Sequence, residues 1–420
     1  MEKPRHALLP FVLLLVGAAA APAFAQAERR PGAESPRFID RQSFAVEREE
    51  LAPVMAADGS GLPFELWRGL DVRTLEELIA DLEIPPKSPA LHALWLRLIT
   101  SNVTPPTGGS ADQQFLALRL ETLYRSGLLE EASRSLQSMP AGSALVTTMA
   151  ARNEIGLGRT NEGCTTAASA APGADFPKPL KGQAALISGY CAAAAGDAAG
   201  AGLAADLARE EGLKNSAGLD ALYAFSVGNV PAVAADRQLS LIDYRILQAT
   251  GARVNTDALL KSAAPSLLAA LALDPQAPAE LRLAAGEAAA RVNAITPEQL
   301  AGIYRAQSAV GVQAPDATGS GERRAQLFVS AETEISPLRK TRAIRSFLDD
   351  ARHADLYLTA LRMIAPTSQT LALAPEIGWY AETGVEMALA IGEYDRARSW
   401  ATFAAAVGAP GNADLAHWLT

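Results

Sequence analysis

The sequence has few of the residues that usually carry chemistry. It contains two cysteines and four histidines, and no histidine lies within metal-ligand spacing of another histidine or of a cysteine. His92 lies in an apolar helical stretch and is expected at the surface or the core edge. Nucleophile-elbow, Ser-x-x-Lys, His-Glu-x-x-His and P-loop motifs are absent. We therefore expect no cofactor, no metal and no enzymatic activity. An unrecognised hydrolase stays an alternative, because catalytic carboxylates need not be neighbours in sequence.

Positive charge and long apolar runs are also scarce. The 420 residues carry 37 basic and 46 acidic side chains, a net charge of −9. This balance argues against nucleic acid and anionic membrane surfaces as partners. After residue 25 no run approaches 18 apolar residues, so we expect no stable membrane insertion of the mature chain.

The N-terminus has the pattern of a secretory signal peptide. Lys3 and Arg5 precede an apolar stretch from Leu8 to Ala21, and Ala23-Phe24-Ala25 follows. We predict a signal peptide over residues 1–25, cut after Ala25, and a periplasmic or secreted protein in a bacterium. An uncleaved N-terminal anchor is the alternative. Residues 26–60 are polar and rich in proline, which predicts a mostly disordered lead.

Alternating strand patterns are missing from the rest of the chain, where helical patterns dominate. Leu75, Leu78, Ile79 and Leu82 form one apolar stripe at helical spacing. The stretch "SPALHALWLRLITS" begins with Ser88 as a predicted N-cap and repeats the stripe. Pro265 interrupts a later apolar pattern, which predicts two short helices or one kinked helix. The sequence therefore predicts an all-α protein.

A helix-turn-helix unit recurs, with a glycine at the turn and a small residue five positions later. The glycine permits the left-handed conformation that ends the first helix, and the small residue permits close packing of the second. The first three turns are 31 and 38 residues apart, near the period of about 34 of tetratricopeptide units. The pairs are Gly127 with Ala132, Gly158 with Gly163, Gly196 with Ala201, and Gly392 with Ala397.

This pattern resembles the tetratricopeptide-like (TPR/Sel1-like) family of α-solenoids. The most similar stretch is "GVEMALAIGEYDRARSWATFA", where Gly392, Tyr394 and Ala397 match the turn and small-residue positions of the family. Leu129 stands where the unit at Gly127 would have this tyrosine, and no unit has the family's full first-helix pattern. The resemblance implies a right-handed superhelix of antiparallel helical hairpins. We place helical repeats at residues 61–310 and 323–420, separated by a loop or linker at 311–322.

The two cysteines lie in helical segments on either side of a proline-rich connection, "APGADFPKP". Cys164 lies about seven residues before this connection and Cys191 about eleven after it, so antiparallel helices place them at similar heights. We predict a Cys164–Cys191 disulfide in an oxidising periplasm, with two buried free thiols as the alternative.

The function expected from these observations is partner binding. An α-solenoid offers a concave surface for proteins or peptides, so we expect a non-catalytic scaffold that binds an unidentified envelope protein or peptide. A peptidoglycan-associated helical accessory protein, related to cell-wall enzymes, is the alternative. One basic cluster could bind an acidic partner segment, or be a solvated helix face: Arg339, Lys340, Arg342 and Arg345.

Overall fold

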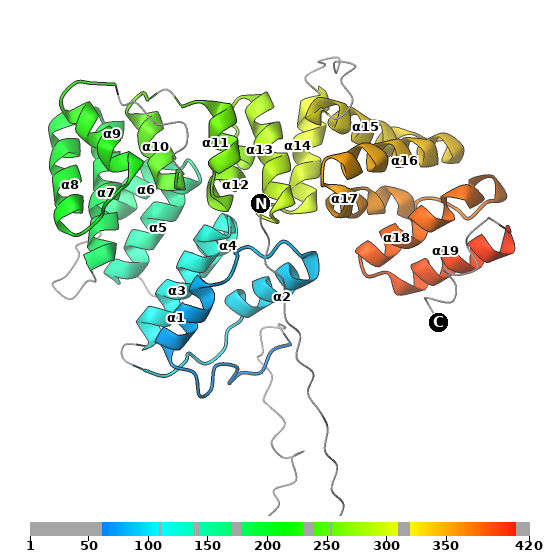
Figure 1. Cartoon of the computed structure of the whole chain (residues 1–420), viewed down its shortest axis with the longest axis horizontal. Helices are drawn as coiled ribbons and strands as arrows, with labels where there is room; N and C mark the ends of the chain where they lie inside the picture. The colour runs from blue at the N-terminus through cyan, green and yellow to red at the C-terminus, as the bar shows by residue number, and fades with distance from the viewer. Residues whose placement is uncertain are drawn as a thin grey trace, which may run out of the picture. The chain divides into compact units, whose positions relative to one another are not determined.

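The computed structural model describes residues 61–108, 111–137, 139, 143–169, 178–230, 239–252, 254–309 and 320–408. Within these ranges the chain is helical and contains no strand apart from one isolated bridge, which confirms the predicted all-α class (Figure 1). No described helix combines the length and hydropathy that a bilayer crossing requires. The predicted signal peptide, the polar lead at 26–60 and most of the loop at 311–322 lie outside the described residues.

The helices follow one another with short connections. Their bounds are α1 (Val72–Ala80), α2 (Pro89–Thr100), α3 (Ala111–Arg125), α4 (Leu129–Gln137), α5 (Ala144–Gly156), α6 (Thr160–Ser169), α7 (Lys178–Ala194), α8 (Ala198–Glu210), α9 (Ala217–Ser226), α10 (Leu241–Ala249), α11 (Thr256–Ser262), α12 (Pro265–Leu273), α13 (Ala279–Arg291), α14 (Pro297–Ala309), α15 (Gly321–Thr333), α16 (Pro337–His353), α17 (Tyr357–Gln369), the 3-10 helix η2 (Pro375–Tyr380), α18 (Ala381–Ala390) and α19 (Tyr394–Ala406).

Most packing occurs between helices adjacent in sequence. The closest pairs are the hairpins α5–α6, α7–α8, α12–α13, α15–α16 and α18–α19. Contacts also join several helices that lie two apart in the sequence, as in α5 with α7, α7 with α9 and α13 with α15. One continuous core runs from α3 to α19, while α1 and α2 form a smaller core on α3 around Trp67 and Trp95. Helical hairpins packed in sequence order therefore form most of the described chain.

All four glycine turns found in the sequence have the expected geometry. The glycines have φ values of 81°, 82°, 78° and 78° at Gly127, Gly158, Gly196 and Gly392. After each turn, the next amide donates to the carbonyl five residues before it, for example Asp197 to Ala192 at 2.8 Å. The small residue five positions after each glycine is buried. The turn and the close helix contact are therefore two parts of one motif.

A further turn of this kind uses aspartate instead of glycine. Asp355 has φ of 55°, Leu356 donates to the carbonyl of Ala351 at 2.9 Å, and Ala360 is buried five positions later. A search for glycine misses this turn, although the small residue at the fifth position marks it. Pro265 begins α12, and two residues separate it from the end of α11, so the segment is two short helices. The helix α15 begins at Gly321, so the last two residues of the predicted 311–322 loop are helical.

A buried ionic network joins α13 to α16. Arg324 on α15 pairs with Glu287 on α13 at 2.6 Å and with Asp350 on α16 at 3.1 Å, and all three side chains are about 95% buried. Tyr304 on α14 donates to Glu287 at 2.8 Å, and burial raises the pKa of its hydroxyl well above the ordinary value. Each buried charge therefore has a partner, which buried charges require.

The close packing of α6 on α5 gives a test of the turn motif. A Cβ on Gly163 would lie 2.6 Å from Ile155 Cγ1 and 3.1 Å from the carbonyl oxygen of Ala151. We expect Gly163→Ala to lower the free energy of unfolding by roughly 1 kcal/mol or more, because the clash outweighs the better helix propensity of alanine.

The matched control is Gly302→Ala on α14, where a Cβ meets nothing within 4 Å. This variant should be stabilised by up to about 1 kcal/mol. Urea unfolding followed by circular dichroism measures both values. Equal stabilisation of the two variants would show that close packing at Gly163 is unimportant.

Candidate functional site

A large cavity lies where several hairpin ends meet, and we call it the central groove. Its volume is about 1070 Å³. The walls come from α2, the starts of α4, α6 and α14, the ends of α7, α10 and α12, and one side of α17. Apolar side chains from four different elements line it: Leu96, Leu157, Leu273 and Ile295.

The hairpin turns build the groove because their backbones approach other helices closely. A Cβ on Gly127 would lie 2.9 Å from the carbonyl oxygen of Pro265 and 3.0 Å from the Cβ of Ala294. Asn293, itself at φ of 55°, donates through its amide to the carbonyls of Pro86 and Lys87 at 2.8 and 2.7 Å. This clamp joins residues more than 200 positions apart and fixes the segment before α2 at one side of the groove.

Two arginines of the groove are held in ion pairs. Arg159 lies 3.3 Å from Glu130 and 3.0 Å from Glu154. Arg245 pairs with Asp274 at 3.0 Å, where both side chains are nearly buried, and donates to the carbonyl of Gly156 at 3.0 Å. Arg245 therefore acts as a structural link between α10 and the neighbouring turns.

His92 on α2 has an unusual environment at the groove. Its Nε2 is buried and meets no hydrogen-bond partner among the described residues. Burial lowers the pKa of the imidazole below its ordinary 6.5, Arg362 on α17 lowers it further, and Glu131 on α4 opposes both effects. His92 is half-buried, which agrees with the core-edge position expected from the sequence, and this edge of the core lines the groove. No described His, Cys, Asp and Glu side chains gather in threes as ligands for a metal ion.

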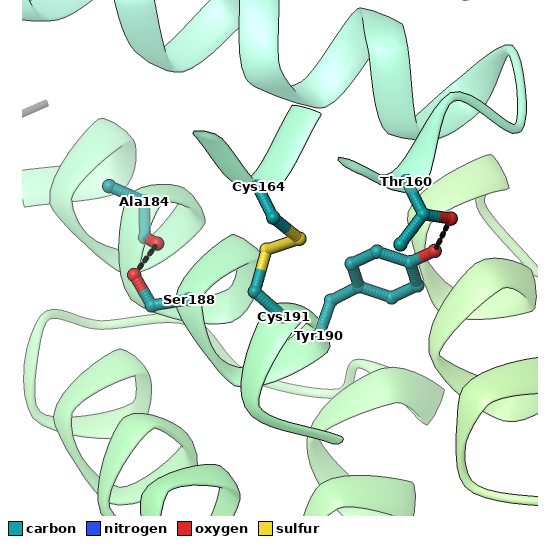
Figure 2. The surroundings of a disulfide bond; sticks show 6 residues. All are labelled: Thr160, Cys164, Ala184, Ser188, Tyr190 and Cys191. Atoms are coloured by element: carbon teal, nitrogen blue, oxygen red, sulfur yellow. Dashed lines mark hydrogen bonds between the residues drawn. A yellow bond between two sulfur atoms is a disulfide. The ribbon is translucent and has the colours of Figure 1, made fainter. Parts of the chain in front are cut away.

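The predicted cysteine pair joins α6 to α7 beside this groove. Cys164 and Cys191 lie at disulfide distance, with 2.03 Å between the sulfurs and 5.6 Å between the Cα atoms (Figure 2). A second link joins the same helices, since the hydroxyls of Thr160 and Tyr190 lie 2.8 Å apart. Thr160 and Tyr190 both line the groove, so the disulfide supports its wall.

The four cations proposed from the sequence all lie on α16, away from the groove lining: Arg339, Lys340, Arg342 and Arg345. Arg339 pairs with Glu334 at 3.4 Å. Arg345 pairs with Asp349 at 3.3 Å and donates to Thr383 at 3.1 Å. Arg342 is exposed and Lys340 is half-buried. Two of the four therefore have partners within the chain, and partner binding by the cluster stays a prediction.

The sequence gives little indication of the groove. Its lining comes from segments that span α2 to α17, and no local pattern distinguishes Leu96 or Leu273 from core leucines. The helix-starting signals near Ser88 and Thr296 mark two of its edges, but only the packing of distant hairpins brings these edges together.

The half-buried imidazole of His92 predicts an acid-sensitive fold. The His92 imidazole titrates near pH 6.5 in the unfolded chain and at a lower pH in the folded chain. Between these two pH values the unfolded chain therefore binds more protons. Stability should therefore fall as the pH drops below about 6.5. In His92→Gln this contribution should be missing, so the loss of melting temperature between pH 7.5 and 5 should be smaller than in the wild type. Parallel melting curves for the two proteins over this range would contradict the assignment.

The disulfide closes a loop with a sequence separation of 27 residues. Constraint of the unfolded chain by such a loop contributes about 3.5 kcal/mol. We expect the double variant Cys164→Ala, Cys191→Ala to lose a free energy of unfolding of this order, measured by urea titration. Reductant should destabilise the wild type similarly and leave the variant unchanged. Two alkylatable thiols in the native secreted protein would contradict the bridge.

The chain matches no protein-family model, no curated protein and no solved structure among those compared with it.

Proposed function

We propose that this protein is a non-catalytic helical-repeat scaffold that binds a partner protein of the bacterial envelope in its central groove. In this proposal the hairpins stack as a right-handed superhelix of the tetratricopeptide-like type. The recurring turns at Gly127, Gly158, Gly196 and Gly392, each followed by a buried small residue, support this reading. Arrays of this kind present concave surfaces that bind peptides and proteins.

The observation that carries the proposal is the groove itself. Its volume of about 1070 Å³ lies slightly above the usual range for ligand pockets, about 300–1,000 Å³. Apolar side chains line it, with polar groups placed among them, as in recognition sites generally. The imidazole of His92 makes no hydrogen bond to a described acidic or nucleophilic side chain. The described residues of the groove therefore offer contacts for binding. They do not include a histidine that is hydrogen-bonded to an acid or a nucleophile.

Secretion into the periplasm belongs to the same proposal. The Ala23-Phe24-Ala25 cleavage pattern supports export, and the Cys164–Cys191 pair suits an oxidising compartment. On α16, Arg342 and its basic neighbours would give a second contact for an acidic segment of the partner.

Photo-crosslinking in living cells tests the proposal. A photoreactive amino acid replaces Ala93 on α2 or Ala194 on α7, which are exposed side chains at different walls of the groove. Ala405, exposed on α19 and outside the groove, is the matched control. We expect both groove positions to give adducts with the same envelope protein, identified by mass spectrometry, and the control to give none.

Two other outcomes would overturn this first choice. Co-sedimentation with purified peptidoglycan, without a protein adduct, would favour an accessory protein of the cell wall. Cleavage of a wall glycan that is abolished by one carboxylate substitution would establish a hydrolase.

A further inference from the structure

We infer that the ligand of the central groove is an uncharged, extended peptide segment with apolar side chains, held by the side-chain amides of Gln276 and Gln299. This inference rests on the proposed function and specifies the chemistry of the partner. Three properties of the groove support it: the pairing of its charges, the position of its amide groups and the distribution of its apolar side chains.

Most charged side chains of the walls have a partner within the chain. Arg159 is held by Glu130 and Glu154, and Arg245 by Asp274. Of the remaining groups, Glu131 pairs with Arg134 at 2.9 Å, Arg362 donates to the carbonyl of Ala390 at 3.1 Å, and Glu298 is exposed at the rim. A charged ligand side chain would lose its hydration on entry and would have to compete with these existing pairs. The groove therefore favours a ligand without charge.

Two amide side chains at the groove have hydrogen-bonding groups to spare. Gln276, in the loop between α12 and α13, is exposed. Its backbone amide donates to Asp274 at 2.9 Å, and its side chain makes no hydrogen bond with a described residue. The Gln299 Oε1, at the start of α14, accepts from the amide of Thr296 at 2.8 Å, and its Nε2 bonds to no described residue. Both side chains line the groove. A side-chain amide offers the same donor and acceptor as a backbone peptide group, so these residues suit the main chain of a ligand.

The apolar side chains that line the groove come from four separate segments of the chain. Leu96 comes from α2, Leu157 from the turn after α5, Leu273 from the end of α12 and Ile295 from the turn before α14. An extended peptide points successive side chains to opposite sides, so apolar residues at alternate positions could contact different walls. The groove thus provides main-chain hydrogen bonding together with separate apolar contacts.

A selection from random peptides tests this inference. A display library of random decapeptides is applied to the purified full chain, and the enriched peptides are measured individually by fluorescence polarisation. We expect enriched sequences to have little net charge and apolar residues at alternate positions. The double variant Gln276→Ala, Gln299→Ala should bind them roughly tenfold or more weakly, because it lacks two neutral hydrogen-bonding groups.

The matched control is Gln137→Ala, which removes an exposed amide at the end of α4, outside the groove, and should leave binding unchanged. Melting curves confirm that both variants fold. A charged consensus, equal affinity for wild type and double variant, or no enriched peptide at all would overturn the inference. If crosslinks from Ala93 and Ala194 persisted in that case, the partner would bind as a folded surface, and the scaffold function would stand.

Discussion

The close contact between the two helices of a hairpin is the constraint on which this structure depends. A residue in the left-handed conformation reverses the chain, and a small residue five positions later lets the second helix lie against the first. At Gly163 the space is so narrow that a single Cβ would meet Ile155 at 2.6 Å. Because successive hairpins use the same motif, their turns can approach other helices, as Gly127 approaches Pro265. The groove is a consequence of these close approaches.

Polar interactions and the disulfide pair hold together the helices that the turns bring close. Asn293 holds the carbonyls before α2, Arg245 joins α10 to Asp274 and to the carbonyl of Gly156, and the Cys164–Cys191 pair joins α6 to α7. These links fix the walls and also use most of the groove's charge internally. The groups that remain for binding are mainly amides and apolar side chains, which is the physical basis of the neutral peptide ligand that we propose. His92 adds a half-buried imidazole whose protonation the fold opposes.

The local features of the fold could be predicted because they depend on interactions between residues close together in the sequence. Helical periodicity, the N-cap position of Ser88 and the break at Pro265 each depend on a few neighbouring residues. The turn at Asp355 could not be recognised from a glycine, because aspartate occupies the left-handed position there. The cysteine pairing could be predicted because one short connection limits how its two helices pack. The α16 cations were visible as a group, but their partners Glu334 and Thr383 depend on packing.

The sequence by itself determined the helical class, the positions of four hairpin turns and the meeting of Cys164 with Cys191. Each of these depends on residues close together in the chain, where spacing and backbone preference decide the outcome. Only the tertiary structure decided that His92, Gln276 and Gln299 share one groove. These residues come from distant helices, and the angles at which hairpins pack depend on side-chain volumes throughout the core. The proposed ligand chemistry therefore depends on how distant hairpins pack, which the sequence alone did not predict.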